Sequence, residues 1–516
     1  MRFYPKADQR RMSLSHPAIR HSRFAVLRAA AINGLLLSLL FLSLFSYIFG
    51  SLYQENGHFH NLNVVFVDYD GGVVSTAVRQ AYQELQGNSF PTLIEHSASQ
   101  YGQPAALQSA VCDIDYWGAL YVSQNASSRL SEALGGGEAA SLYNRSDALT
   151  FVWNEARYST VIDSLANAMN TLSSTAEAVY TRINGTGSVA LLNASDPTAI
   201  SIFANPWELA SIDIQSTVQG SRLIYNTLVI ILILIQEFFF LGTINGLYAQ
   251  FQLFGRISAR RIIVFRLLIS ALYTLAGSLC TAGAIWAFRA GWHVSGKQWA
   301  LTWLILWLFA HLNFLTLDVF TVWLPPPYVP MALISWVILN VTSILLPFEL
   351  SPAFYRWGYA LPAHAVFQVL IDIWSGGCNP QLGYALPVLF AYELSSGVLS
   401  GIGVYRRSHY AVIAVEREEK AFQEKIAAAL EDHMQEAASE PEEKTTVGNS
   451  HEGRDEIGEE IGRTNTAQRV RRLDTISGRE DLADRIWRAT SGLSSEQTDL
   501  IRKDTLGPSF DLSYKA

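Results

Sequence analysis

The sequence predicts a polytopic α-helical membrane protein with six transmembrane helices, an external α/β domain after the first span, and a disordered cytosolic tail. Hydrophobic residues make up 50% of the 516 residues and charged residues only 16%. Several apolar runs reach the ~20 residues that are needed to cross ~30 Å of hydrocarbon. Between the first two runs lies a long stretch without such a segment, in which strand-like and helix-like patterns alternate.

The chain begins with a polar, basic segment at residues 1–28, which is followed by an apolar run at Ala29–Phe49. A cleavable signal peptide starts in the same way, but this run is long enough to span and no small-x-small site clearly follows it. We therefore expect an uncleaved transmembrane helix at 29–50. The positive-inside rule keeps the basic flank in the cytosol, so the chain emerges on the other side at residue 51.

Residues 51–221 are predicted to form the external α/β domain, because no segment in this range is both long and apolar enough to span. Asn63–Asp68 and Trp117–Val122 are rich in β-branched or apolar residues and are expected to be strands. Apolar residues at helical spacing follow each strand. Helices are expected at Ser75–Leu85, near Ser127–Leu134 and at Asn154–Arg182.

Four Asn-x-Ser/Thr sequons fall within this predicted domain, at Asn125, Asn144, Asn184 and Asn193. Any one of them arises easily by chance, but together they lie on the side of the membrane that the predicted topology places outside the cytosol. We therefore expect N-glycosylation of a lumenal or extracellular domain. A fifth match, at Asn340, lies inside a predicted span, where no glycan can be attached.

Five further spans are predicted within residues 222–405, and the remaining residues, 406–516, are assigned to the tail. Arginines follow the cytosolic ends of the second and sixth spans, and an even number of spans places both termini in the cytosol. In the tail, Val415–Gln435 favours a solvated helix, and the polar composition from Ala437 onward predicts disorder. The spans are expected at about Leu223–Ile244, Ile262–Phe288, Trp299–Trp323, Tyr328–Leu346 and Tyr384–Val404.

Residues 349–382 connect the fifth and sixth predicted spans on the external side. Apolar residues recur at roughly helical spacing in Ala365–Trp374, with prolines before and glycines after this range. We predict a short amphipathic helix that lies on or dips into the membrane face and docks the external domain on the bundle. A connector that only fills space is the alternative. The interfacial residues are Arg356, Trp357, His364, Asp372 and Trp374.

Polar residues inside the predicted spans form the candidate functional cluster. A charge in mid-membrane costs ~2.5–3.5 kcal/mol on insertion scales, so such residues usually face a partner or a polar path. The predicted topology places Glu237, Arg266 and Asp318 in the cytosolic half of the bilayer. His311 lies one to two helical turns before Asp318 in the same predicted span. Our hypothesis is that Arg266 pairs with one of the two carboxylates. Snorkelling, or a structural pairing without a transport role, is the alternative.

No catalytic residue, metal site or cofactor is predicted, and we do not expect an enzyme. Gly291–Gln298 nearly matches a phosphate-binding loop, but it lacks the final hydroxyl residue and a preceding strand. Asp68 and Asp70 form a carboxylate pair, although Asp is common at strand ends and turns for conformational reasons. Cys112 and Cys378 are expected on the same side of the membrane, so their pairing is conceivable, but no disulfide framework or metal-site spacing supports it.

Three stretches resemble the fungal nitrosoguanidine-resistance membrane proteins: QEFFFLGTINGLYAQF at 236–251, FYRWGYALPAH at 354–364 and IWSGGCNPQLGYALPVL at 373–389. The layout over roughly residues 25–410 is also similar. This family looks distantly similar to the membrane subunits of type-two ABC exporters and to bacterial phage-infection-type membrane proteins. The resemblance implies a plasma-membrane protein that is linked to resistance to toxic compounds and to lipid distribution between leaflets. It supplies no catalytic residues.

The predicted function is therefore to support resistance to toxic compounds, by export or by changing lipid asymmetry between the leaflets. Membrane lipids and a small-molecule or lipid substrate are the expected partners, and no nucleic acid is expected. Because the chain carries no ATP motif, export would require a partner ATPase or an ion gradient. The alternative is a non-transporting scaffold or regulator, in which the external domain and the tail bind a partner protein or a second copy.

Overall fold

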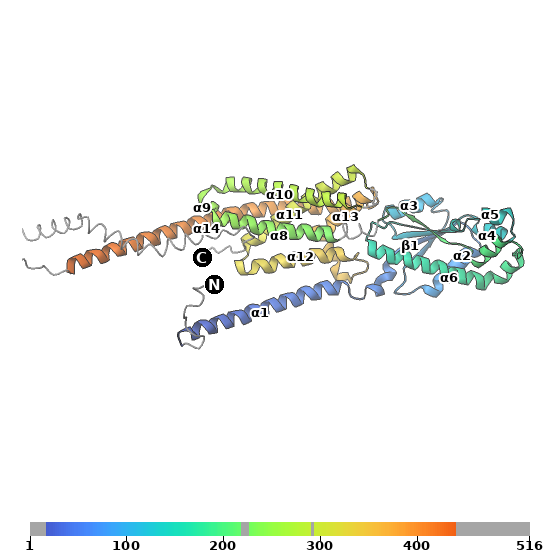
Figure 1. Ribbon diagram of the computed structural model, residues 1–516, viewed down its shortest axis with the longest axis horizontal. Coiled ribbons are helices and arrows are strands. Elements are labelled where there is room, and N and C mark those ends of the chain that lie inside the picture. Colours follow the sequence, from blue (N-terminus) through green and yellow to red (C-terminus); the bar gives the residue numbers. More distant parts are fainter. Residues whose placement is uncertain (1–16, 218–226, 290–293, 440–516) are drawn as a thin grey trace, which may run out of the picture. The chain divides into compact units, whose positions relative to one another are not determined.

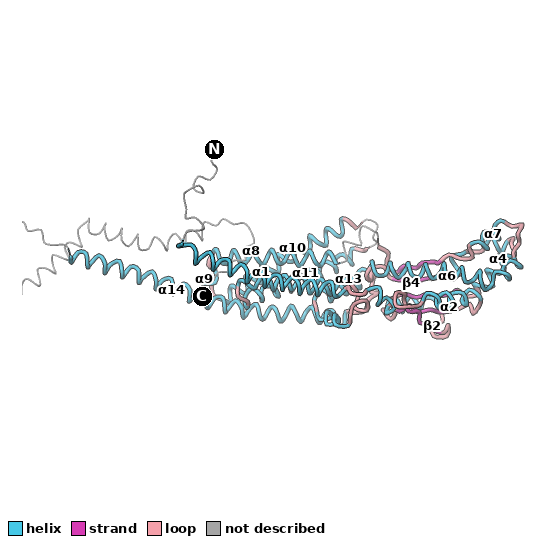
Figure 2. Tube along the Cα trace, turned by 90° about the horizontal axis from the view of Figure 1, so that it is seen from below, coloured by secondary structure: helices cyan, strands magenta, loops and turns pink. Residues whose placement is uncertain are grey.

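The computed structural model describes residues 17–217, 227–289 and 294–439 (Figure 1). Most of these residues are helical, and the strands, magenta in Figure 2, lie between residues 63 and 213. Of the disorder predicted from Ala437 onward, residues 440–516 fall outside the described residues, as do the first sixteen residues of the basic segment, whereas residues 437–439 end a helix. The predicted tail helix is described and forms the last part of α14 (Leu382–Ser439).

Five helices in the described ranges are long and apolar enough to cross a membrane, and the chain is a polytopic membrane protein. A sixth helix that was predicted to span, α12 (Val329–Leu345), has 17 residues. At 1.5 Å per residue it is about 25 Å long, somewhat less than the thickness of a typical hydrocarbon core. The five long helices are α1 (Pro17–Ser51), α8 (Thr227–Gln250), α10 (Ala259–Ala287), α11 (Gly296–Trp323) and α14.

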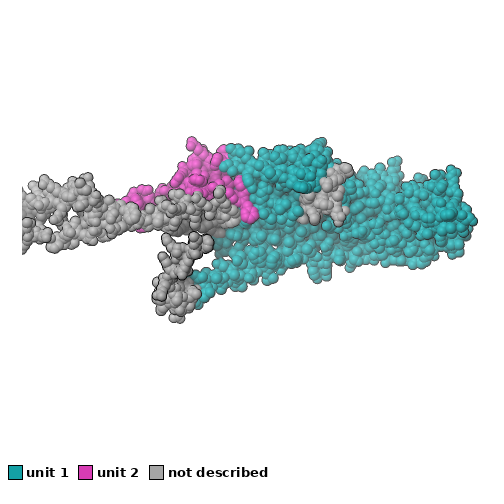
Figure 3. All heavy atoms as spheres, viewed as in Figure 1, with its two compact units in different colours: residues 1–238, 268–400 teal, residues 239–267, 401–516 magenta. Residues whose placement is uncertain are grey.

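The chain divides into two compact units (Figure 3). Unit 1 comprises residues 1–238 and 268–400, and unit 2 comprises residues 239–267 and 401–516. Unit 1 therefore holds the whole sheet, most of the apolar helices and the connection between α12 and α14. Unit 2 holds the end of α8, the short helix α9 (Leu253–Arg256), the start of α10 and the second half of α14.

Unit 1 contains a five-stranded sheet with the order β2-β1-β3-β4-β5. Strands β1, β2 and β3 are parallel to one another, β4 is antiparallel to β3, and β5 is parallel to β4. The strand predicted at Asn63–Asp68 is confirmed with the same limits as β1, and the strand predicted at Trp117–Val122 is confirmed as β3 (Gly118–Val122). The other strands are β2 (Thr92–His96), β4 (Leu149–Trp153) and β5 (Leu209–Asp213).

Helices cover both faces of this sheet. Figure 1 shows α3 (Pro104–Cys112) on one face, and α2 (Val73–Leu85) and α6 (Ser159–Leu191) on the other. Alternate residues of a strand point to opposite faces, so one register row of buried residues faces α3 and the next row faces α2 and α6. The α3 side has its own buried cluster: Val65, Val67, Leu107, Val111, Ala119, Tyr121 and Val152.

The helices predicted in this region are confirmed as α2, as α4 (Ala126–Leu134) and as α6, which extends nine residues beyond the predicted end. Proline and Asp196 mark the start of α7 (Pro197–Ala204), where the Asp196 side chain accepts a hydrogen bond from Thr198 N. The remaining elements of the region are α5 (Glu138–Leu142) and the 3₁₀ helices η2 (Glu55–Asn61) and η3 (Arg145–Asp147).

The connection between α12 and α14 folds into η5 (Ala353–Ala360) and α13 (Pro362–Trp374). The predicted helix at Ala365–Trp374 is confirmed, and Pro362 in the first turn gives it an earlier start. Its surroundings differ from the prediction. Side chains on every face of α13 are buried, because α11, α12 and η5 pack around it. A helix enclosed by protein on all sides does not lie on a membrane surface, so the amphipathic surface helix is wrong, and α13 is an internal helix of unit 1.

The loop that resembles a phosphate-binding motif has a structural role at its described end. Ser295 and Gln298 form a capping box at the start of α11, in which each side chain contacts the backbone of the other residue. Nε2 of Gln298 also donates to the carbonyl oxygens of Ile373 (2.8 Å) and Trp374 (3.2 Å). The side chain of Gln298 thus forms hydrogen bonds with backbone groups at the start of α11 and at the end of α13. The glycine and histidine at 291 and 293 lie outside the described residues.

Candidate functional site

Polar side chains of α11 and α14 meet within unit 1 along a row that we call the polar seam. Nδ1 of His311 donates to Oε1 of Glu393 over 2.6 Å, and Nε2 of His311 lies 3.2 Å from Oγ of Ser270 on α10. The hydroxyl groups of Thr316 and Ser396 are 2.9 Å apart. The seam consists of His311, Thr316 and Asp318 from α11 and of Glu393, Ser396 and Ser400 from α14.

Asp318 forms the second carboxyl-containing contact of the polar seam. Its side chain is fully buried, and its Oδ2 accepts a hydrogen bond from Oγ of Ser400 over 2.5 Å. Oδ1 accepts a weaker bond from Thr321 over 3.2 Å. In α14, Glu393, Ser396 and Ser400 are three and four residues apart, so they share one face of the helix. The seam therefore follows from helical periodicity in both helices.

Arg266 belongs to unit 2, where it has a partner that the sequence analysis did not consider. Its Nη2 donates to Oδ1 of Asn245 over 2.8 Å, and its guanidinium lies 5.3 Å from the centre of the Tyr248 ring. Nη1 of Arg407 reaches the same Asn245 oxygen at 3.4 Å. All three polar residues are buried. The predicted pairing of Arg266 with Glu237 or Asp318 stays a prediction, because those two carboxylates belong to unit 1.

Glu237 is a fully buried carboxyl group in the middle of α8. Neither of its oxygen atoms has a hydrogen-bond partner among the residues that the structure describes. It interacts electrostatically with Tyr273 of α10. A buried carboxyl group without a partner is costly in a membrane span, and its position is a functional-site hypothesis by default.

A groove of about 650 Å³ lies beside Glu237, between α8 and α10. On the α10 side its wall is built from small residues one turn apart, Ala276, Cys280 and Ala284, which leave room that larger side chains would fill. Gly277 lets the side chain of Gln236 on α8 approach closely, since a Cβ at this position would clash with Nε2 of Gln236. The groove is mostly apolar, and its polar members are Gln236, Tyr273, Cys280 and Thr281.

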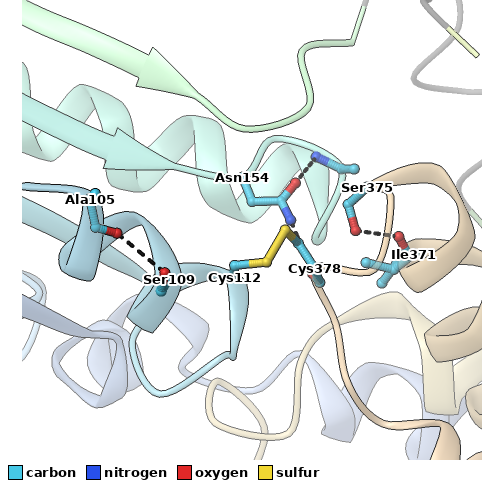
Figure 4. Close-up of a disulfide and its surroundings, with 8 residues drawn as sticks. Ala105, Ser109, Cys112, Asn154, Ile371, Ser375 and Cys378 are labelled. Carbon is cyan, nitrogen blue, oxygen red and sulfur yellow. Dashed lines mark hydrogen bonds between the residues drawn. A yellow bond between two sulfur atoms is a disulfide. The ribbon is translucent and has the colours of Figure 1, made fainter.

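A disulfide bond between Cys112 and Cys378 joins the sheet region to the helical part of unit 1 (Figure 4). Cys112 ends α3, and Cys378 follows the double glycine after α13. Nδ2 of Asn154 also donates to the carbonyl oxygen of Cys378 over 3.3 Å. The pairing that the sequence left unsupported is thus present. The other cysteine of the chain, Cys280, is free and exposed on α10.

Noncovalent contacts strengthen the same connection. The ring of Tyr158 meets the ring of Phe367 edge-on, with centroids 4.9 Å apart, and Nδ2 of Asn61 donates to the carbonyl oxygen of Glu349 over 2.9 Å. On the helical side, Tyr355 donates from its hydroxyl group to the carbonyl oxygen of Tyr47 on α1 over 2.8 Å. Residues 349–382 therefore contact the sheet region, as expected of a dock, although through other side chains than those named from the sequence.

The five predicted interfacial residues have different surroundings. His364 and Trp374 are buried in α13, where Nδ1 of His364 donates to the carbonyl oxygen of Ser343 (2.9 Å) and Nε1 of Trp374 donates to Oγ1 of Thr302 (3.1 Å). Burial lowers the pKa of His364 to about 4, so its ring is neutral at physiological pH. The other three residues are less enclosed: Arg356 and Trp357 are exposed, and Asp372 is half-buried.

The two carboxylates at the end of β1 are occupied by bonds within the fold. Asp68 accepts hydrogen bonds from the hydroxyl group of Ser75 (2.6 Å), from the backbone amides of two turn residues and from Arg79 (2.7 Å). Asp70 accepts bonds from both the backbone amide and the hydroxyl group of Ser127. Both therefore organise the turn after β1, and no cluster of three or more potential metal ligands occurs in the described ranges.

The sequence analysis missed the residues that complete the site. Glu393 stands in an apolar run, FAYELSS at 390–396, and the rule that selected Glu237 and Asp318 would also have selected it. The groove has no such signal, because alanine, cysteine and glycine in a span are compatible with ordinary helix packing. Only the position of α8 relative to α10 shows that these small residues face an open space.

The comparisons with known proteins agree with a membrane location. Residues 33–398 match the family described as "Protein of unknown function (DUF3533)". Over 175 residues the chain is 26% identical to an uncharacterized endoplasmic reticulum membrane protein of Saccharomyces cerevisiae. That match covers 31% of this chain and about a third (34%) of the yeast protein. No solved structure matches the chain.

Proposed function

The chain belongs to the family of proteins of unknown function DUF3533, and we propose that it binds a lipid or another hydrophobic molecule in the groove between α8 and α10. The groove is the observation that carries this proposal. Its volume of about 650 Å³ is within the range of small-molecule sites. Because both helices are candidate membrane spans, a groove between them opens onto hydrocarbon, and an occupant with a large apolar surface fits it.

Movement of the bound molecule would support resistance to toxic compounds, either by export or by changing lipid asymmetry between the leaflets. The buried carboxyl group of Glu237 beside the groove, together with the His311–Glu393 hydrogen bond of the polar seam, places ionisable side chains within the set of helices. We therefore propose that an ion gradient drives the movement of the bound molecule. A partner ATPase is the alternative energy source. Catalysis is not part of the proposal.

We place the sheet region outside the cytosol, with six spans and both termini cytosolic. The Cys112–Cys378 disulfide supports this placement, because disulfides persist in oxidising compartments and are rare in the cytosol. The ER lumen and the cell exterior are equivalent in this respect. We keep the plasma membrane as the predicted location, and the name of the yeast relative makes the endoplasmic reticulum the alternative.

The test compares cells that lack the protein with cells that express it or a variant, in a leaflet-exposure assay and in a toxic-compound resistance assay. Ala276→Trp and Ala284→Trp fill the groove and are expected to abolish activity. Leu279→Trp on the same helix is the matched control, because Leu279 is exposed but does not line the groove. Glu237→Gln and Asp318→Asn probe the polar groups. Full activity of both groove-filling variants would refute the proposal.

A non-transporting scaffold is the second candidate, and the covalent attachment of the sheet region to the helical region favours it. A protein whose two parts are tied at Cys112–Cys378 is suited to present a fixed surface to a partner. This candidate predicts that the groove-filling variants keep full resistance while changes in the exposed surface of the sheet region abolish it.

A further inference from the structure

Arg157 is a buried cation without a carboxylate partner. It lies in the loop between β4 and α6, and its side chain is 8% exposed. Nη1 donates to the carbonyl oxygen of Tyr116 over 3.2 Å, and the guanidinium lies 3.8 Å from the centre of the Trp117 ring. The ion pairs found among the described residues do not include it. Burial lowers its pKa to about 10, so it is still charged at neutral pH. The nearby carboxylate of Glu349 attracts Arg157 but forms no salt bridge with it. A buried charge without a direct ion pair is costly, which favours an additional anionic partner from outside the chain.

Two phenol groups whose hydroxyl oxygens are buried accompany this cation: Tyr158 follows it in the sequence, and Tyr384 is a neighbour of Tyr158. The hydroxyl groups of Tyr158 and Tyr384 have no hydrogen-bond partner among the described residues, and Tyr158 interacts electrostatically with both Arg157 and Tyr384. Tyr158 has φ +92°, a left-handed conformation that is unfavourable for a side chain of this size. Such strain collects at sites where the surroundings fix a functional geometry. The two hydroxyl groups can donate to the same anion as Arg157.

The same place also carries an unpaired carboxylate. Glu349 follows α12, interacts electrostatically with Arg157, Tyr158 and Tyr359, and forms no ion pair in the described part of the chain. The Tyr359 ring is 41% exposed, and its centre lies 6.2 Å from that of Tyr384. Aromatic faces beside a carboxylate attract an ammonium group. A cation and an anion that attract each other without forming a salt bridge, with tyrosines near both, complement a ligand that itself carries separated charges.

The position of these residues selects the ligand class. Glu349 follows the last turn of α12, and Tyr384 lies in the first turn of α14, so both mark the ends of apolar helices where the sheet region begins. Tyrosines at such ends lie at the level of lipid head groups. We propose that Arg157, Tyr158, Glu349, Tyr359 and Tyr384, which we call the junction cluster, bind the head group of a zwitterionic phospholipid. Its phosphate would meet Arg157 and the phenols, and its ammonium group would meet Glu349.

The experiment measures lipid binding by native mass spectrometry of the full-length protein in mild detergent. The probes are phosphatidylethanolamine, phosphatidylcholine and the anionic phosphatidylglycerol. Wild-type protein is expected to retain one zwitterionic lipid in preference to phosphatidylglycerol. Arg157→Gln should weaken this binding about tenfold or more, and Tyr384→Phe, which removes one oxygen atom, about two- to tenfold.

Matched controls separate binding from folding. Arg129→Gln removes an arginine, and Tyr143→Phe a phenol, elsewhere in the sheet region, where Tyr143 donates to the carbonyl oxygen of Pro206. Both are expected to bind lipid as wild type does. Ala276→Trp is expected to lose only a lipid held in the groove and to keep the junction lipid with its zwitterionic preference, so that the groove proposal and this one fail separately. Formation of the Cys112–Cys378 disulfide reports that each variant is folded. Unchanged binding in Arg157→Gln and Tyr384→Phe, or a preference for phosphatidylglycerol, would overturn the proposal.

Discussion

At the residue scale, the fold gives several polar side chains more than one partner. Gln298 completes the ends of two helices, and Asp68 holds the turn after β1 together with Ser75 and Arg79. Both residues drew interest as parts of ligand-binding patterns, and both are explained by hydrogen bonds within the chain. Residues whose polar atoms have no such partner, such as Glu237 and Tyr384, are the stronger functional candidates, since the fold alone does not account for them.

The pH dependence of the sheet region is predicted to involve Glu177 of α6. Burial, together with the nearby Glu208, raises the pKa of Glu177 from 4.5 to about 7 in the folded protein. Between these two values the folded state binds more protons than the unfolded state, so stability falls as the pH rises from about 4.5 to 7. Glu177→Gln removes this loss. At pH 8 the amides of α6 are expected to exchange more slowly in the variant than in wild type, and at pH 4 equally fast.

Hydrogen exchange of the full-length protein, corrected for the intrinsic effect of pH, measures this difference. Glu132→Gln on α4 is the control, because Glu132 is an exposed carboxylate of the same region. Equal protection of α6 in wild type and Glu177→Gln at pH 8 would contradict the prediction.

At the element scale, helices are held together by polar rows as well as by apolar packing. The polar seam joins α11 to α14 at three levels through His311, Thr316 and Asp318. In a membrane, apolar side chains gain little from leaving lipid for a helix interface, so close packing and interhelical hydrogen bonds contribute a larger share of helix association. Between α8 and α10, by contrast, small residues leave a groove. The same set of helices therefore contains a closed interface and an open one.

Loss of one bond in the polar seam is expected to destabilise the closed interface. Ser400→Ala removes the hydroxyl group, and with it the 2.5 Å hydrogen bond to Asp318, without adding bulk to the buried interface. A buried hydrogen bond to a carboxylate contributes about 1.5–3 kcal/mol, so the midpoint of thermal unfolding in detergent should fall. Ser395→Ala, on the exposed face of the same helix, should leave the midpoint unchanged. Equal midpoints for the two variants would show that the bond does not support the interface.

At the scale of the whole molecule, the disulfide closes a separation of 266 residues and connects α3 to the segment after α13. It makes residues 349–382 a fixed dock for the sheet region. The four sequons allow a test of which side of the membrane the sheet region occupies, because only accessible asparagines can carry a glycan. Asn125, Asn144 and Asn193 are exposed, whereas Asn184 lies within α6, with its amide donating to Tyr180 and Ser188.

The state of the cysteines gives a direct test of this connection. A maleimide of high mass should modify one thiol, Cys280, when the full-length protein is denatured without a reductant, because the chain has three cysteines and two are paired. After reduction it should modify three. Cys112→Ser should give two labels without reductant. Three labels on unreduced wild type would show that the bond does not form in cells.

Glycosylation tests the placement of the sheet region outside the cytosol. Removal of N-glycans is expected to shift the electrophoretic mobility of the wild-type protein, and the triple variant Asn125→Gln, Asn144→Gln, Asn193→Gln should lose this shift. Asn184→Gln alone should retain it, because the side chain of Asn184 is engaged within a helix. A wild-type protein without any N-glycan would argue against the proposed topology.

How much of this molecule the sequence predicted depends on the range of the interactions involved. The apolar runs, β1, α2 and α4 follow from local composition and periodicity, which act over a few residues, and these elements were predicted close to their observed limits. The prediction for α13 identified a helix but not its environment. The residues that bury α13 on all sides come from α11, α12 and η5, and the periodicity of residues 365–374 contains no information on them.

The sequence by itself determined that the chain is a membrane protein with a helix-and-strand region after its first span, because hydrophobicity and its period are properties of consecutive residues. Only the tertiary structure decided which polar residues meet. It paired Cys112 with Cys378 and His311 with Glu393, gave Arg266 a partner in Asn245, and opened a groove at Ala276 and Cys280. These outcomes depend on how distant helices are rotated and placed, since a rotation of one helix exchanges every contact that its side chains make.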